Sequence, residues 1–460
     1  EPTMRTTVLM PLALLACAAP VPPAGASDGA TLQEASEPAA SAPQESPAAA
    51  QPGFRPLVIG DPPAEALEPF FAGSTYDPAV LAPDEVLGRP LGTRMASHDE
   101  VLAIWRAWAE QSPRVTLERY GLTHEGRELV FGVVTSAANL ERLDGIRNAI
   151  ARLADPRELS SAEEDALVAE TPAIAWLGYS IHGDETSGVD GGLALAYHLI
   201  ASTDEEVARL LDGTVAVIDP CMNPDGRERY RSMMMQSAGA VPSLDVDSLS
   251  RGRWPWGRGN HYLFDMNRDW MTGIAPETRG RWSVVRRFPP QLFVDAHEMG
   301  ALDTYLFYPQ STPRNPCLPP TLNRWQGVFG DAQAAAFDQH GWSYYTREWA
   351  DAWGPFYSDA WGSLNGAIGM LYEQARYGGQ PLRRASGEVV PDREAAWHQA
   401  VASLASLTAL ADHREEVLRD YVAFKRSNLD TSAPGRDRAF VLRPGRHPSR
   451  ERWLVETLLA

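Results

Sequence analysis

The chain has 460 residues, of which 44% are hydrophobic and 22% charged, and this composition is typical of a globular protein rather than a disordered or membrane-spanning one. Its formal net charge is -19 at pH 7 and no basic cluster offsets it, so we expect no nucleic-acid partner, because phosphate binding requires gathered cations. The 3 cysteines do not form a disulfide framework, and Cys221 and Cys317 are expected to be buried thiols rather than a pair.

Residues 1–26 are similar to an export signal, so no membrane span is expected in the mature protein. An apolar run between residues 8 and 16 ends in Leu14-Leu15-Ala16-Cys17, which is similar to a bacterial lipoprotein cleavage box and would place a lipid anchor on Cys17. The alternative is cleavage after Ala26, behind small residues. We expect an exported protein in either case, located in the periplasm, in the outer membrane as a lipoprotein, or outside the cell.

The rest of the chain divides by composition into four parts. Residues 27–53 are rich in Ala, Pro and Ser and predict a disordered linker, and residues 54–98 predict an irregular arm. Residues 99–426 predict the main α/β domain. Residues 427–460 predict a linker and the start of a further α/β unit, which suggests that the chain is truncated.

Strand and helix patterns alternate along the main domain. The predicted helices cover residues 99–110, 139–154, 189–200 and 393–426, and the predicted strands cover residues 115–120, 128–135, 173–177, 214–218, 291–296 and 367–372. Such alternation predicts a mostly parallel sheet, and ligands bind outside the carboxyl ends of the strands in sheets of this kind.

The loop that follows the strand at 173–177 carries His182 and Glu185, three positions apart. An imidazole and a carboxylate at this spacing can bind one cation, although the pattern is common by chance. His297, which follows the strand at 291–296, supplies a third ligand at the same edge of the sheet. Two histidines and one glutamate are typical of a catalytic zinc site, since structural sites are more often closed by cysteines.

Glu373 follows the strand at 367–372 directly, so we expect it at the same edge rather than on a solvated face. A carboxylate that does not bind the cation can take a proton from water and return it to a leaving group. Glu373 is therefore the candidate general base.

Five motifs, taken in their order along the chain, resemble those of the zinc carboxypeptidase superfamily, the relatives of pancreatic carboxypeptidase. The sequence around the motifs most resembles the large exported bacterial members of that superfamily. The motifs are His182-x-x-Glu185, Asn223-Pro224-Asp225-Gly226, Asp265-Met266-Asn267-Arg268-Asp269-Trp270, Asp295-Ala296-His297 and Tyr372-Glu373. The resemblance covers about residues 99–379. It implies an α/β fold with a mixed, mostly parallel, twisted sheet of eight strands, helices on both faces, and one Zn2+ per chain.

The resemblance also implies roles for single residues. His182, Glu185 and His297 would bind zinc, and Glu373 would be the general base. Asp265 would orient an imidazole, most simply that of His182, whereas the partner of Asp295 is left open.

Substrate would be held by further matched positions. Asn267 and Arg268 would bind the terminal carboxylate of the substrate, which suits the planar fork of arginine. One arginine among Arg251, Arg253 and Arg258 would stabilise the developing oxyanion, and we choose Arg258. Tyr357, with Tyr345 behind it, is the candidate for the mobile tyrosine that closes over substrate.

The favoured function is a zinc metallocarboxypeptidase that hydrolyses C-terminal peptide bonds. The alternative is a zinc amidase or peptidase acting on cell-wall muropeptides or another amide that bears a free carboxylate. A catalytically silent binding module would lack a ligand or the base, and the sequence retains all of them. The side chain that the enzyme prefers is not predicted.

Overall fold

The computed structural model describes residues 67–239, 241–430, 441–443 and 445–459. The predicted export signal with Cys17, the linker at 27–53 and the first part of the arm lie outside these residues. Among the helices in the described part, none combines the length and the apolar character that crossing a membrane requires.

A seven-stranded mixed sheet forms the centre of the domain, in the order β1-β2-β4-β3-β5-β7-β6. Its strands are β1 (Val115–Leu122), β2 (Glu128–Val134), β3 (Ala173–Tyr179), β4 (Thr214–Asp219), β5 (Leu292–Met299), β6 (Tyr305–Phe307) and β7 (Ile368–Ala375). The central strands β4, β3, β5 and β7 are parallel, and β1, β2 and β6 join them in antiparallel pairings. The mixed sheet is as predicted, but it has seven strands rather than the eight expected. Two short strands, β8 (Leu382–Arg383) and β9 (Val389–Val390), form a separate hairpin.

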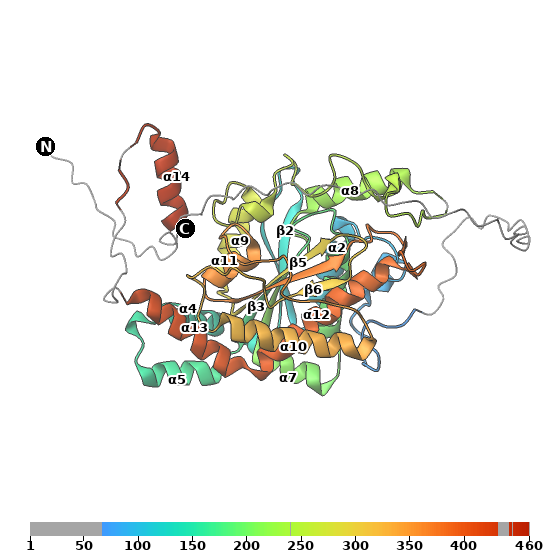
Figure 1. Cartoon of the computed structure of the whole chain (residues 1–460). Coiled ribbons are helices and arrows are strands. Elements are labelled where there is room, and N and C mark those ends of the chain that lie inside the picture. The colour runs from blue at the N-terminus through green and yellow to red at the C-terminus, as the bar shows by residue number, and fades with distance from the viewer. Residues whose placement is uncertain (1–66, 240, 431–440, 444, 460) are drawn as a thin grey trace, which may run out of the picture.

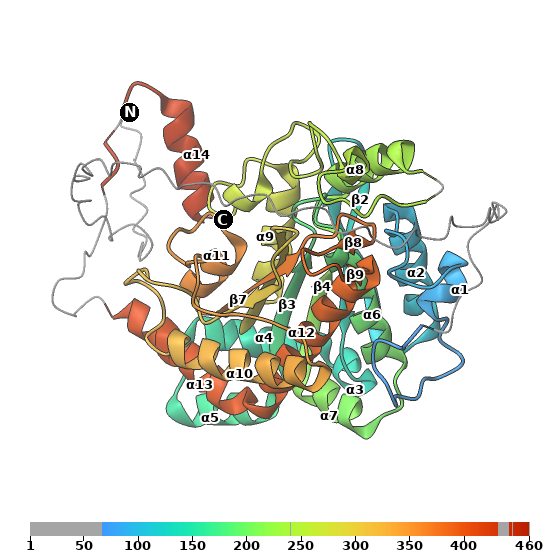
Figure 2. The same ribbon diagram turned by 45° about the vertical axis from the view of Figure 1, so that its right-hand side comes forward.

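Helices cover both faces of this sheet (Figures 1 and 2). The α-helices are α1 (Pro83–Leu87), α2 (His98–Gln111), α3 (Ala137–Glu141), α4 (Leu143–Ala154), α5 (Ser161–Glu170), α6 (Ser187–Ala201), α7 (Glu205–Gly213), α8 (Pro224–Ser237), α9 (Pro276–Arg287), α10 (Leu322–His340), α11 (Ser358–Leu364), α12 (Asp392–Asp412), α13 (Arg414–Leu429) and α14 (Pro448–Leu459). Helices α2, α6, α10 and α12 contribute to one apolar core, and α4, α9 and α13 to a second.

Strand β3 separates the two cores. Ala175 and Leu177 face the first core, and Trp176 between them faces the second, as the period of two along a strand requires. Every residue of β3 is buried, which explains why the sequence shows an unbroken apolar run there rather than an alternation.

Two of the predicted helices are broken in the structure. The stretch at 393–426 forms α12 and α13, which meet at His413, and the stretch at 139–154 forms α3 and α4, which meet at Arg142. In the region predicted to start a further α/β unit, residues 427–460, the structure has the helix α14, whereas Val441 and Leu442 belong to no strand. Trp453 of α14 lies under the Arg279 guanidinium of α9, 4.1 Å from its ring centroid, so α14 contacts the main domain.

The strands that carry the candidate site are longer than predicted. Strands β5 and β7 continue to Met299 and Ala375, so His297 and Glu373 lie inside strands rather than past their ends. The charged residues ended the apolar pattern on which the prediction relied, but the ladder itself continues past them. His297 and Glu373 are paired in the parallel register of β5 and β7, which places their backbones side by side.

Candidate active site

A tight turn after β3 brings His182 and Glu185 together. Ser180 has a φ of 56°, which turns the chain away from the sheet, and α6 starts at Ser187. Gly183 lies so close to the start of α8 that a Cβ atom there would stand 2.1 Å from the Arg227 nitrogen. Only glycine fits this approach, and it lets Glu185 Oε1 lie 2.7 Å from His182 Nδ1.

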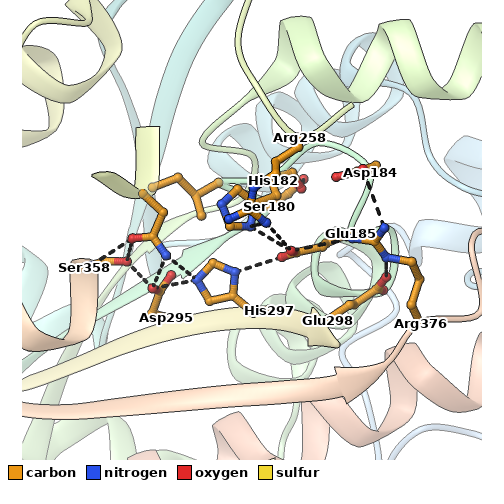
Figure 3. Close-up of polar contacts among 12 residues, drawn as sticks. Ser180, His182, Asp184, Glu185, Arg258, Asp295, His297, Glu298, Ser358 and Arg376 are labelled. Atoms are coloured by element: carbon orange, nitrogen blue, oxygen red, sulfur yellow. Dashed lines mark hydrogen bonds and ion pairs between the residues drawn. The ribbon is translucent and has the colours of Figure 1, made fainter. Parts of the chain in front are cut away.

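The three predicted zinc ligands form one buried group (Figure 3). Glu185 lies between the two imidazoles, with Oε2 2.8 Å from His297 Nδ1. One ligand atom from each residue lies within 4.8 Å of the others. Burial alone would raise the pKa of Glu185, but the imidazoles of His182 and His297 hold it well below its usual range.

Each histidine also faces a carboxylate through its other ring nitrogen. His182 Nε2 lies 3.2 Å from Asp265, and His297 Nε2 lies 2.7 Å from Asp295. A proton on each Nε2 would be donated to the aspartate, which leaves both Nδ1 lone pairs directed at the space beside Glu185. Two imidazole nitrogens, each oriented by an aspartate, and one carboxylate oxygen are a donor set that fits zinc. The partner that the sequence left open for Asp295 is therefore His297.

Glu373 lies beside this group without belonging to it. It lines a cavity of about 360 Å3 together with His182, Glu185 and His297. Burial, and to a smaller extent the nearby Glu185 carboxylate, raises the pKa of Glu373 to about 8 in the protein without a metal. A divalent cation at the three ligands would lower this pKa again, since it favours the charged carboxylate.

Among the three arginine candidates, Arg258 is the one that lines the cavity. Its Nε donates to Asp265 at 3.0 Å, and its Nη1 lies 3.3 Å from His182 Nδ1 (Figure 3). Arg251 instead donates to backbone carbonyl groups, among them those of Ser243 and Asp245. The structure thus separates Arg258 from Arg251, which sequence spacing could not do.

Asn267 and Arg268 both line the cavity, but in different ways. Asn267 is buried, with Nδ2 donating to Asp295 Oδ2 at 3.3 Å and Oδ1 accepting from the Ser358 backbone at 2.9 Å. Its amide is therefore engaged by the protein itself, which differs from the expectation that it grips the substrate. Arg268 is exposed, and its guanidinium lies over the Tyr357 ring, 4.7 Å from the centroid.

The two candidate tyrosines lie in different places. Tyr357 immediately precedes α11 and lines the cavity. Tyr345 donates its hydroxyl hydrogen to Met299 or Asp303, and it does not line the cavity. Tyr357 is thus the tyrosine that a substrate in the cavity would meet.

Sequence reasoning missed a second buried charged cluster behind the ligands. Arg376 lies 3.6 Å from Asp184 and 3.7 Å from each of Glu185 and Glu298 (Figure 3). Glu298 also accepts from the Ser187 backbone at 2.7 Å, which ties β5 to the start of α6. The only sequence signal was proximity, since Arg376, Asp184 and Glu298 each lie within three positions of a predicted ligand or the base.

A family model agrees with the predicted zinc chemistry of this site. A family model described as zinc carboxypeptidase matches residues 101–369. No curated protein sequence matches the chain significantly. Among solved structures, a metallo-carboxypeptidase from Burkholderia cenocepacia aligns at 17% identity and a TM-score of 0.45, over 68% of this chain and 68% of that one.

Two further solved structures are similar. A Pseudomonas aeruginosa metallo-carboxypeptidase in complex with (2-guanidinoethylmercapto)succinic acid aligns at 17% identity and a TM-score of 0.42, over 69% of this chain and 68% of that one. Carboxypeptidase A from Helicoverpa armigera aligns at 16% identity and a TM-score of 0.44, over 72% and 80% of the two chains. The family model covers more than half of the sequence, so the chain belongs to the zinc carboxypeptidase family and is a zinc metallopeptidase.

Proposed function

We propose that the protein is an exported metallocarboxypeptidase that removes C-terminal residues from peptides, with Glu373 as general base and His182, Glu185 and His297 as the zinc ligands. The observation that carries this proposal is the pairing of His297 with Glu373 in the register of β5 and β7. This pairing supports the role of Glu373, because its side chain lines the same cavity as the three candidate ligands and the exposed Arg268.

Zinc, when bound, polarises the carbonyl of the substrate and lowers the pKa of water. The side chains of the protein transfer the proton, stabilise the oxyanion and bind the substrate. Glu373 accepts a proton from the attacking water at a carboxylate oxygen and delivers it to the nitrogen of the leaving amine. Arg258 directs N–H groups toward the oxyanion that forms at the carbonyl. Arg268 holds the terminal carboxylate of the substrate, and Tyr357, packed under Arg268, borders the same space.

The proposal is tested with Glu373→Gln, which keeps the size of the side chain but cannot accept the proton. We expect one zinc per chain in both wild type and variant, and a loss of kcat by about 10²–10⁴-fold on a blocked dipeptide with a free C-terminus. Metal analysis and steady-state kinetics measure both. Glu388→Gln, at an exposed glutamate of the β8–β9 hairpin, is the matched control and should leave kcat unchanged.

The substrate class is tested by pairing each peptide with its C-terminal amide. Hydrolysis of the free acid alone supports the carboxypeptidase proposal, because Arg268 requires a carboxylate partner. Bound zinc with turnover of muropeptides but of no peptide would favour the cell-wall alternative. Full activity of Glu373→Gln would exclude Glu373 as the base.

A further inference from the structure

A second cavity, separate from the candidate active site, lies among helices α9, α11, α13 and α14 and strand β5. Its volume is about 350 Å3, at the lower end of the range of about 300–1,000 Å3 that small-molecule sites have. Phe293, Trp361 and Tyr421 give it aromatic walls, and Leu458 of α14 borders it. Figures 1 and 2 show α14 near α9 and α11, on the side of the molecule where this cavity lies.

Lys425, the single lysine in the whole sequence, lines this apolar cavity. Its ammonium lies 5.1 Å from the centroid of the Tyr421 ring, one helical turn earlier in α13. Within the described residues, this ring is the only partner of the ammonium, which makes no ion pair there. The neighbouring Arg426, in contrast, is paired with Glu164. Burial without a carboxylate partner lowers the pKa of Lys425 to about 8.

The charge of the cavity is opposite to that of the protein. The chain carries a formal net charge of -19, yet the cationic Lys425 lines the cavity, and no acidic side chain of the described residues does. A cation in apolar surroundings is stabilised when an anion enters with it, since an ion pair there is screened much less than in water. The aromatic walls of the cavity favour a ligand that is apolar apart from its anionic group.

We propose that this cavity is a binding site for an apolar monocarboxylate, such as an alkanoate. The carboxylate pairs with the Lys425 ammonium, and the hydrocarbon part lies among Phe293, Trp361 and Tyr421. Helix α11 forms a wall of this cavity through Trp361 and a wall of the active-site cavity through Asp359, so the two cavities are separated by one short helix.

The single lysine provides a direct test, because full-length protein labelled with [13Cε]lysine gives one lysine resonance. We expect octanoate to shift this resonance to saturation and to bind at least about tenfold more tightly than 1-octanol, which has the same chain without the charge. Lys425→Met should weaken octanoate binding at least about tenfold in calorimetry and leave octanol binding unchanged or stronger. Arg426→Met removes the adjacent cation outside the cavity and should change neither.

A cavity-filling variant, Thr457→Trp on α14, checks where the probe binds, and it should weaken octanoate and octanol alike. Equal affinities for octanoate and octanol in wild type would overturn the proposal, as would octanoate affinity that Lys425→Met leaves unchanged. The absence of a saturable shift at 10 mM octanoate would overturn it as well. Thermal melts of Lys425→Met and Thr457→Trp show whether each variant is folded, so a loss of binding can be assigned to the cavity.

Discussion

At the scale of single residues, the candidate metal group depends on carboxylates that face the histidines from behind. Asp295 contacts His297 at 2.7 Å and is fully buried, and Asp265 contacts His182 at 3.2 Å. Each aspartate fixes which ring nitrogen carries the proton and how the ring is turned. The imidazoles are therefore held in the orientation for zinc before the metal arrives.

Replacing Asp295 by asparagine tests this orienting effect. Because an amide accepts a weaker hydrogen bond and can present its N–H group to His297 instead, we expect Asp295→Asn to lower zinc affinity by about 10–100-fold. Competition with a fluorescent chelator measures the affinity. Asp303→Asn, at an exposed aspartate in the loop after β5, should retain the affinity of the wild type; equal affinities in all three proteins would contradict the prediction.

His198, in the last turn of α6, predicts a pH dependence of stability. Burial lowers its pKa to about 4, and its ring stacks on Phe71 with the centroids 4.1 Å apart. An unfolded histidine has a pKa of about 6.5, so the folded state, which favours the neutral His198 ring, keeps its full free energy of unfolding above that pH. This free energy of unfolding decreases as the pH falls toward 4. Between pH 7.5 and 5, wild type should lose about 2 kcal/mol more of its free energy of unfolding than His198→Gln.

Urea denaturation at the two pH values measures this difference. His124→Gln, at an exposed histidine in the turn between β1 and β2, is the control and should lose as much stability as wild type over the same interval. An equal loss in wild type and in His198→Gln would contradict the prediction.

Single residues also show what the sequence could and could not predict. The grouping of the three candidate zinc ligands beside Glu373 was predictable because each of these residues follows an apolar run and belongs to an ordered motif. The contacts of Arg376 with Asp184 and Glu298 were not, because they join three separate segments whose approach is a property of the folded chain. The engagement of Asn267 by Ser358 was hidden for the same reason.

At the scale of elements, close packing of α2 on β2 supports the sheet on which the site stands. Trp105 of α2 lies against Gly132 of β2, where a Cβ atom would stand 2.0 Å from the indole ring. Gly132 pairs with Ile218 of the parallel strand β4, and Trp105 belongs to the first apolar core. The absence of a side chain at position 132 therefore lets the Trp105 indole reach the sheet.

Gly132→Val tests this packing. Because the added side chain must displace a buried indole, we expect a loss of about 1–3 kcal/mol in the free energy of unfolding. Gly145→Ala is the matched control within α4, where a Cβ atom meets nothing within 4 Å, and it should be neutral or stabilise by up to about 1 kcal/mol. Thermal or urea denaturation compares the variants; equal effects of the two substitutions would contradict the prediction.

Periodicity predicted the existence of most elements but not all of their boundaries. The break between α12 and α13 at His413 carries no glycine or proline, so the sequence from 393 to 426 shows one continuous helical pattern. The two helices turn there because they pack on different partners, α12 on α6 and α10, and α13 on α4 and α5. Tertiary packing decides such a break, and local propensity does not.

At the scale of the whole molecule, the metal group joins separate parts of the fold. Glu185 and His182 come from the segment between β3 and α6, and His297 comes from β5, over 100 residues later in the sequence. Zinc bound at these side chains would favour the folded chain, because the unfolded chain does not hold the three ligands together.

Zinc removal should therefore destabilise the protein. At a free zinc concentration 100–1,000 times the dissociation constant, bound zinc contributes about 2.7–4.1 kcal/mol, so we expect a chelator to lower the melting temperature and added zinc to restore it. Differential scanning calorimetry measures both steps. Glu185→Gln serves as the matched variant and should respond less to the chelator; an unchanged melting temperature of chelated wild type would contradict the prediction.

The residue pairing of β5 with β7 has a consequence for changes in chain length. The connecting segments between Gly300 and Ile368 that lie outside β6, α10 and α11 could change in length without moving His297 relative to Glu373, because the pairing of β5 with β7 sets that relation. One residue inserted between Ile368 and Glu373 would instead turn the carboxylate to the opposite side of the sheet. Insertions and deletions in these connecting segments therefore keep the catalytic pair in place, whereas those in β7 displace Glu373. Variants with altered substrates are thus more readily obtained by changing the connecting segments than by changing β7.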